Sequence, residues 1–180
     1  LADTYNQPGI FTAMTGFEWT SQPSGNNLHR IVVFADGADK TGRVRPFSMF
    51  DSQDPAKLWD YMEKYEAATG GRVFAHVHNG NLSNGIAFTA TTVDGAPMDA
   101  AYAARRSRWE PIMEITQMKG DGETHPYLSP EDEFADFERW DVGNLDGSAP
   151  KQKEMLRYEY GRSALLTGLE GEAKVGQAPF

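Results

Sequence analysis

Two histidines stand two residues apart where an apolar segment runs into a loop of glycine and asparagine. They are His76 and His78 in the stretch Phe-Ala-His-Val-His-Asn-Gly-Asn-Leu-Ser-Asn-Gly, residues 74 to 85. Gly and Asn tolerate the left-handed turns that end a strand sharply, and imidazoles placed at such a point commonly bind metals or anions. The stretch therefore predicts part of a metallohydrolase site.

The residues of this stretch are expected to play different parts. Spacing of i and i+2 points both imidazoles to one face of a strand, but the loop begins directly after His78. We therefore interpret His78 as a metal ligand and His76 as a packed residue or one that holds a ligand in place. Asn79 and Asn81 are candidates for amide contacts to a substrate, although asparagines in loops more often stabilise turns.

A segment upstream is expected to supply a carboxylate and a third imidazole. Residues 10–20 are rich in aromatic and β-favouring types, and residues 27–34 form a second predicted strand after a Ser/Pro/Gly/Asn loop. In a hairpin of these two strands, the expected register places Glu18 directly opposite His29, with Cβ atoms about 5 Å apart. A shift of one residue in that register would separate the two side chains.

Three further polar residues are candidates for contact with an anionic substrate. Arg30 and Lys119 are the bases closest in sequence to the candidate ligands. Because Arg30 alternates with His29 along a strand, it should face the other way. His125 lies in a glycine-rich polar loop, where both an exposed position and a place near the site stay open.

Helix and strand signals alternate through the middle of the chain. Asp54-Pro55 is a strong helix start and Gly70-Gly71 a strong stop, and the Ala-rich residues 99–109 predict a second helix. Residues 72–77 are predicted to form a strand between these two helices. This order predicts a crossover unit of an α/β sheet or barrel, where chemistry gathers at the carboxyl ends of the strands.

The second half of the chain predicts one more strand and two more helices. The strand covers residues 112–117 with Glu114 in its middle, where a lone carboxylate needs a cation, hydrogen-bond partners or a surface position. A helix is expected to start at Ser129-Pro130, with a final helix at residues 151–169. Their predicted buried residues are Phe134, Phe137 and Trp140 in the first and Leu156, Tyr160, Ala164 and Leu165 in the second.

Composition excludes several classes of protein. The 180 residues suit a single globular domain, and no run of 18 apolar residues is present to span a membrane. The net charge is −9, and residues 121–146 carry nine acids against one base. Such a field repels polyanions, so we expect no general nucleic-acid binding. We interpret the acidic run as a solvated helix face, with cation binding as the alternative.

The sequence contains no cysteine. Disulfides, thiolate metal ligands and a cysteine nucleophile are therefore excluded. The compartment stays open, because cysteine-free domains are found in both the periplasm and the cytoplasm. The oligomeric state is not predicted.

Several long motifs in one order resemble a bacterial family of uncharacterised proteins. That family is similar to the PHP (polymerase and histidinol phosphatase) metal-dependent hydrolases, and the resemblance covers essentially the whole chain. The motifs are Gly16-Phe-Glu-Trp-Thr20, Asn27-Leu-His-Arg30, His78-Asn-Gly-Asn-Leu-Ser-Asn-Gly85, Trp109-Glu-Pro111, Gln117-Met-Lys-Gly-Asp-Gly-Glu-Thr-His-Pro126 and Ser129-Pro-Glu-Asp-Glu-Phe-Ala135.

The resemblance implies an α/β fold that is part of a distorted, TIM-like β/α barrel. PHP proteins hold two or three divalent metal ions, usually Zn, Mn or Fe, and hydrolyse phosphate esters. By resemblance, Glu18 matches a bridging carboxylate, and His29 and His78 match two separate histidine ligands. His76 stands where the family pattern has a different residue, so the resemblance does not assign it as a metal ligand. The family's early His-x-His, Asp-His and late Asp-x-His are missing, so residues 1–180 resemble the central segment of a larger catalytic domain.

The expected function is that of a metal-dependent hydrolase, a phosphoesterase that uses metal-activated water on a small anionic substrate. Glu18 and His78 are its expected catalytic residues. One alternative is a non-catalytic carbohydrate- or ligand-binding module that uses the asparagine-rich loop and the tryptophans. Another is amidohydrolase-like cleavage of a C–N bond at a similar metal centre.

Overall fold

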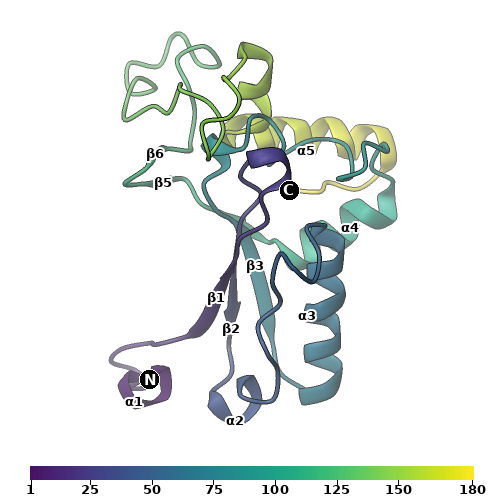
Figure 1. Cartoon of the computed structure of the whole chain (residues 1–180). Helices are drawn as coiled ribbons and strands as arrows, with labels where there is room; N and C mark the ends of the chain where they lie inside the picture. The colour runs from purple at the N-terminus through teal and green to yellow at the C-terminus, as the bar shows by residue number, and fades with distance from the viewer.

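Four strands form one mixed sheet in the computed structural model, which describes residues 1–180 (Figure 1). The order is β1 (Thr15–Trp19), β2 (Arg30–Phe34), β3 (Val73–Val77) and β4 (Ile112–Met113). β2 pairs antiparallel with both β1 and β3, and β4 pairs with β3 in parallel. A separate small hairpin follows, made of β5 (Thr116–Gln117) and β6 (Gly120–Asp121).

Helices connect these strands, and α3 lies along the sheet (Figure 1). The short helices α1 and α2 lie at the opposite end of the sheet from α4 and α5 (Figure 1). The α-helices are α1 (Ala2–Tyr5), α2 (Ala38–Thr41), α3 (Pro55–Thr69), α4 (Ala100–Trp109) and α5 (Gly161–Val175), and the 3-10 turns are η1 (Pro23–Gly25), η2 (Gly80–Leu82) and η3 (Lys153–Tyr158). None of the helices combines the length and the apolar character that crossing a membrane requires.

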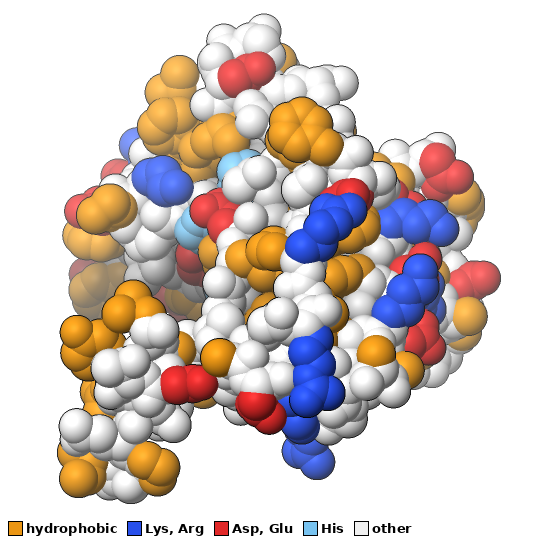
Figure 2. All heavy atoms as spheres, turned by 60° about the horizontal axis from the view of Figure 1, so that its bottom comes forward, with side chains coloured by type: hydrophobic (Ala, Val, Ile, Leu, Met, Phe, Trp, Pro, Cys, Tyr) orange, Lys and Arg blue, Asp and Glu red, His pale blue; other side chains and the backbone are white.

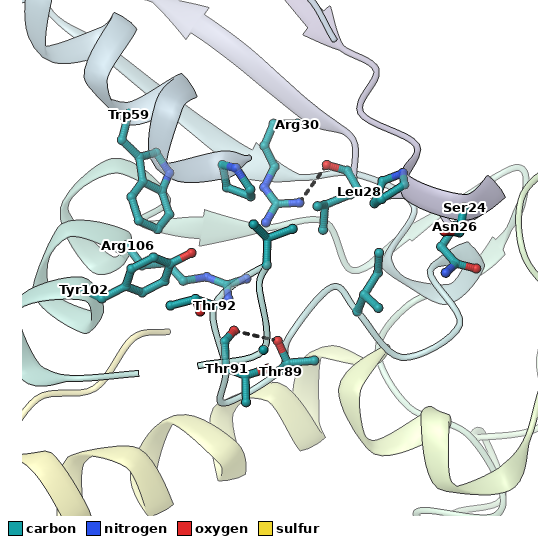
Figure 3. A pocket seen from close by; sticks show the side chains of 15 residues that line it. Ser24, Asn26, Leu28, Arg30, Trp59, Thr89, Thr91, Thr92, Tyr102 and Arg106 are labelled. Carbon is teal, nitrogen blue, oxygen red and sulfur yellow. Dashed lines mark hydrogen bonds between the residues drawn. The ribbon is translucent and has the colours of Figure 1, made fainter. Parts of the chain in front are cut away.

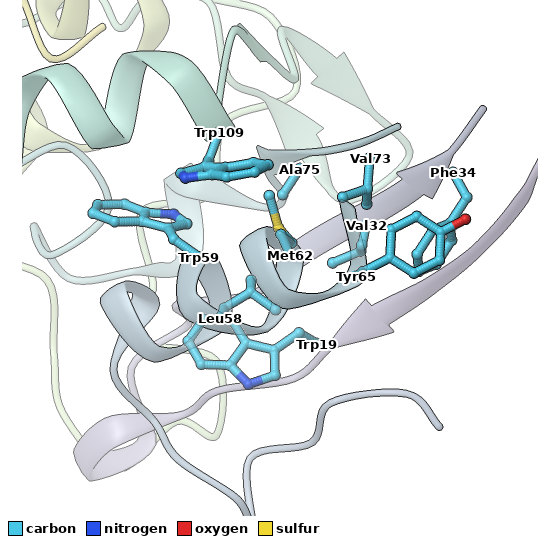
Figure 4. Packing of buried hydrophobic residues seen from close by; sticks show 10 residues of the cluster. All are labelled: Trp19, Val32, Phe34, Leu58, Trp59, Met62, Tyr65, Val73, Ala75 and Trp109. Carbon is cyan, nitrogen blue, oxygen red and sulfur yellow. The ribbon is translucent and has the colours of Figure 1, made fainter. Parts of the chain in front are cut away.

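The main core lies between the sheet and the helices α3 and α4 (Figure 4). Burial alternates along β2 and β3, so every second side chain faces the helices and the others face the opposite side. The core residues are Trp19, Val32, Phe34, Leu58, Trp59, Met62, Tyr65, Val73, Ala75 and Trp109. The alternate side chains of these two strands, which are Ile31, Val33, Phe74 and His76, therefore face the side that the helices leave uncovered.

Both ends of α3 are determined by local chemistry, as predicted. The Asp54 side chain accepts a hydrogen bond from the Ala56 N–H at 2.9 Å, and Pro55 opens the first turn. Gly70 ends the helix at φ 62, in the left-handed region that glycine adopts without strain. The start of α4 is also confirmed, because Asp99 accepts from the Tyr102 N–H at 2.8 Å.

Asp54→Ala is expected to lower the free energy of unfolding by about 1 kcal/mol, because it removes the acceptor for an N–H at the start of α3. Asp54→Asn is the control, since its side-chain oxygen can still cap the helix. Urea unfolding followed by circular dichroism measures both. Equal losses in the two variants would contradict a capping role.

The predicted strand at residues 112–117 is divided, which is a correction. β4 contains only Ile112 and Met113, and Glu114 stands between β4 and β5. Its backbone N–H still donates to the Val77 carbonyl at 3.4 Å, and its carboxylate accepts the Asn79 backbone N–H at 3.1 Å. The sheet is mixed with two helices packed on it, and it does not close into a barrel within residues 1–180. The TIM-like barrel stays a prediction.

The helix predicted from Ser129 is wrong: the segment consists of turns and bends. Phe134 and Phe137, predicted to be buried, are 79% and 58% exposed. Local side-chain bonds compete with a helix here, because Asp132 accepts the Phe134 N–H and the Ser129 hydroxyl bonds to Thr124.

The single helix predicted at residues 151–169 is two elements, η3 and α5, which is a further correction. Between them, the fully buried Glu159 pairs with Lys151 at 2.7 Å and accepts the Gly85 N–H. The bond from Gly85, 74 residues away, ties Glu159 to the asparagine loop at the point where the two elements meet. Leu165, predicted to face inward, is 52% exposed.

Candidate metal centre

Two imidazoles and two carboxylates meet at one end of the sheet, on the face opposite α3. His29 Nδ1 lies 2.8 Å from Glu18 Oε1, and His78 Nδ1 lies 2.7 Å from Glu114 Oε2. His78 Nε2 lies 3.5 Å from the same Glu18 oxygen, which links the two pairs. We call Glu18, His29, His78 and Glu114 the His–Glu cluster. Figure 2 shows histidine side chains reaching the surface beside carboxylates.

The strand register brings Glu18 and His29 together, although not as predicted. Glu18 pairs with Ile31 rather than with His29, so the predicted register is wrong by two residues. A shift of two keeps every side chain on its face, and residues diagonal across an antiparallel pair remain within reach of long side chains. The predicted contact is therefore present with a different pairing.

His78 follows the last residue of β3, and Glu114 holds its ring. Besides His78, the carboxylate of Glu114 accepts from the Asn79 N–H and from Gln117 Nε2 at 3.0 Å. Burial raises the pKa of Glu114, but the hydrogen bonds from His78 and Asn79 outweigh it and lower the pKa below its usual range. Glu114 is therefore a carboxylate at neutral pH and fixes the orientation of the imidazole.

The other edge of the His78 ring faces a second carboxylate. A neutral imidazole carries one proton, and the 2.7 Å contact assigns it to Nδ1 as donor to Glu114. Nε2 then presents a lone pair to Glu18 Oε1, which is also an acceptor. A second proton on the ring or a cation between the two acceptors stabilises this arrangement.

His29 is buried, and burial is the main cause of a pKa below the usual histidine value. The hydrogen bond and the charge of Glu18 oppose that shift, and the charges of His78 and Lys119 add to it. The ring is therefore neutral at neutral pH. Nδ1 donates to Glu18, and Nε2 is buried with no hydrogen-bond partner. An unpaired ring nitrogen with a lone pair is suited to a metal ion.

No group of three or more His, Asp or Glu side chains in the structure is arranged to hold a metal ion. The reason is visible in the cluster: Glu18 with His29, and Glu114 with His78, are joined directly by hydrogen bonds rather than aimed at a common point. The donor types, two imidazoles and a carboxylate, nevertheless suit Zn, Mn or Fe.

The asparagines of the loop lie inside the protein, which corrects their predicted place at a substrate. Asn79 is buried in the left-handed region at φ 54, and its side-chain oxygen accepts from Gln117. Asn81 is also buried, and its side chain donates to the Lys119 carbonyl at 3.3 Å. Both therefore stabilise the loop that ends at the cluster.

The alternative of a binding module that uses the asparagine loop and the tryptophans stays a prediction, and three of the four tryptophans are buried. Trp19, Trp59 and Trp109 belong to the core (Figure 4). Trp140, in the segment after β6, donates its indole N–H to the Gly143 carbonyl at 2.8 Å.

Arg30 and Lys119, the two predicted substrate-binding bases, lie in different environments. Arg30 points away from the cluster to the helix-covered side, where it pairs with Glu110 at 2.9 Å. The prediction that Arg30 binds substrate at the cluster is therefore wrong. Lys119 is exposed at the turn between β5 and β6, and its charge is among those that lower the pKa of His29. Lys119 is thus placed to attract an anion.

The other two histidines do not join the cluster. His125 is buried, bonds to Asp141 at 3.0 Å and accepts the Tyr127 N–H, so it stabilises its own loop rather than facing a substrate. His76 contacts the Val77 carbonyl at 3.1 Å and makes no ion pair with a carboxylate.

Sequence reasoning missed Glu110, whose carboxylate lies between Arg30 and Arg106. The spacing of Arg106 and Glu110, i and i+4 at the end of a predicted helix, was a signal for part of this arrangement. Nothing in the sequence places Arg30 beside Glu110, because the two residues are 80 positions apart.

The structure is a mixed α/β domain with a cluster of histidines and carboxylates at its strand ends. The chain belongs to a family described as a protein of unknown function (DUF3604), whose model matches residues 1–180. The predicted membership of an uncharacterised family is confirmed. Comparison with curated proteins and with solved structures found no match.

Proposed function

We propose that this chain supplies ligands to the divalent metal site of a hydrolase that acts on phosphate esters. Glu18, His29 and His78 would hold the metal, and Glu114 would orient His78. The observation that carries the proposal is His78 between two carboxylates, at 2.7 and 3.5 Å, beside His29, whose buried Nε2 has no hydrogen-bond partner. A cation at Nε2 removes the conflict between the two acceptors.

The resemblance to PHP hydrolases supports the same three ligands. It selected Glu18, His29 and His78 by motif, and these residues are 11 to about 60 positions apart in sequence yet lie together in the structure. The family pattern contains further ligands that this chain lacks, so we expect a complete site only with additional residues.

When bound, a metal of this kind lowers the pKa of a coordinated water towards 7 and polarises the phosphoryl oxygen. The residues of this chain perform the other tasks. Glu114 holds the His78 ring in one orientation, the buried environment keeps His29 neutral, and the exposed Lys119 attracts the anionic substrate.

Metal binding tests the proposal directly. Titration of Zn or Mn into the metal-free intact protein, followed by calorimetry, is expected to show binding that Glu18→Gln and His78→Ala each weaken at least tenfold. His125→Ala is the matched control, because that histidine lies outside the His–Glu cluster. Equal metal affinity in wild type and His78→Ala would exclude this site.

Hydrolysis by the intact protein then identifies the bond that is cleaved. We expect metal-dependent release of nitrophenol from p-nitrophenyl phosphate, and its loss in Glu18→Gln and on metal removal. Cleavage of an anilide with no cleavage of the phosphate ester would instead indicate an amidohydrolase.

A further inference from the structure

A cavity of about 250 Å³ lies on the helix-covered side of the sheet, away from the His–Glu cluster (Figure 3). Residues of β2, α3, α4 and the loop after η2 line it. Arg30 and Arg106 are the only charged residues in its wall. A purely cationic wall is unexpected in a chain with a net charge of −9.

The two arginines share a single buried carboxylate, that of Glu110. Arg30 Nε lies 2.9 Å from Glu110 Oε1, and Arg106 Nε lies 3.5 Å from Oε2. All three side chains are at most 5% exposed. Two guanidinium groups and one carboxylate leave one positive charge without an anionic partner, although the Arg106 guanidinium also lies 4.2 Å from the centre of the Phe180 ring. A buried charge without a counter-ion is costly.

The charges of this group are retained at neutral pH. Burial raises the pKa of Glu110, but the positive charges of Arg30 and Arg106 outweigh it and lower the pKa. Burial lowers the pKa of Arg106 to about 10, which still leaves the guanidinium protonated.

Each arginine also has a donor that the protein does not use. Arg106 Nη2 donates to the Ala87 carbonyl at 2.6 Å and Nε faces Glu110 Oε2 at 3.5 Å, whereas Nη1 makes no hydrogen bond. Arg30 uses Nε and Nη1 and makes no hydrogen bond through Nη2. Figure 3 shows both guanidinium groups directed into the space bounded by Trp59, Tyr102 and Thr91.

We propose that this pocket binds the carboxylate of a small organic acid. One carboxylate neutralises the single unmatched charge, and the flat fork of an arginine pairs well with it. Trp59 and Tyr102, whose rings meet edge to face at 5.0 Å, form a wall for the uncharged part of the ligand. The cavity has the volume of about eight liquid waters, which suits an acid the size of benzoate.

Titration with benzoate in metal-free buffer tests this assignment, with benzamide as the neutral analogue of the same shape. We expect benzoate to shift the Trp59 indole N–H and the Arg106 Nε–H resonances saturably, and benzamide to leave them unchanged. Thr91→Phe narrows the pocket without removing a charge and should weaken benzoate binding at least tenfold. Thr12→Phe, at an exposed position outside the pocket, is the matched control and should bind as wild type.

His78→Ala separates this proposal from the metal site, because benzoate binding should be unchanged in that variant. The assignment is overturned if neither acetate nor benzoate shifts these resonances saturably at about 10 mM. It is also overturned if benzamide binds equally well, or if Thr91→Phe has no effect. Tighter binding of inorganic phosphate than of benzoate would overturn the carboxylate class.

Discussion

Glu110→Ala is expected to lower the free energy of unfolding by about 3–5 kcal/mol. The substitution leaves two guanidinium groups buried with no carboxylate between them, and it also removes the acceptor of the Trp59 indole N–H at 3.0 Å. Urea unfolding at neutral pH, followed by tryptophan fluorescence and by circular dichroism, measures the loss.

Two further variants separate charge from hydrogen bonding. Glu110→Gln keeps an oxygen for Arg30 and Trp59 but loses the charge, so its cost should lie between wild type and Glu110→Ala. Glu123→Ala breaks an exposed carboxylate–arginine pair, that with Arg162, and should cost less than about 1 kcal/mol. Similar losses in Glu110→Ala and Glu123→Ala would show that the buried charge balance is unimportant.

The helices that could be predicted from the sequence are those whose ends depend on adjacent residues. Asp54 and Asp99 each cap the N–H groups two or three positions ahead, and Gly70 supplies its own backbone conformation. Such signals lie within one turn of the element that they end. The segment after Ser129 carried the same signals, yet its side chains found other partners, because Asp132 also pairs with the distant Arg162.

The sheet was predictable to a lesser degree, because alternation determines the face of a residue but not its exact partner. Glu18 and His29 were placed on the correct face with the wrong pairing. The two side chains still make contact because the predicted register is wrong by an even number of residues, which leaves both on the same face of the sheet. The loop between β1 and β2 adopts η1 rather than a tight turn, and its conformation is what sets the register.

The partners of the site residues could not be predicted, since they depend on how separate elements pack. Glu114 reaches His78 across 36 residues, and Glu110 reaches Arg30 across 80. In both cases the strand or helix was predicted, but the pairing arises only when β3, β4 and α4 come together. Burial of the asparagine loop has the same origin, because Asn79 and Asn81 bond to residues of the later β5–β6 hairpin.

Glu114→Gln is expected to weaken metal binding at the His–Glu cluster by about 10 to 100-fold, the usual cost of losing a carboxylate that orients a ligating histidine. Glutamine can still accept from His78 Nδ1, but it cannot also accept the Asn79 N–H and the Gln117 amide as the carboxylate does. The ring of His78 then loses both its fixed orientation and the negative charge that makes Nε2 a better donor to a metal. Calorimetric titration of Zn or Mn, compared with the exposed control Glu123→Gln, measures the difference.

The same variant makes a distinct prediction about acid stability. The pKa of Glu114 in the folded protein is below its usual value, since the hydrogen bonds from His78 and Asn79 outweigh burial. The carboxylate therefore stabilises the fold above about pH 4.5, its unfolded value, and this contribution is lost as the pH falls through the folded pKa. Wild type should lose more stability than Glu114→Gln between about pH 5 and pH 3, because the variant has no carboxyl group at position 114 to take up a proton. Urea midpoints that fall in parallel for the two proteins would show that Glu114 is not held as an ion by His78, and the orienting role would fail with it.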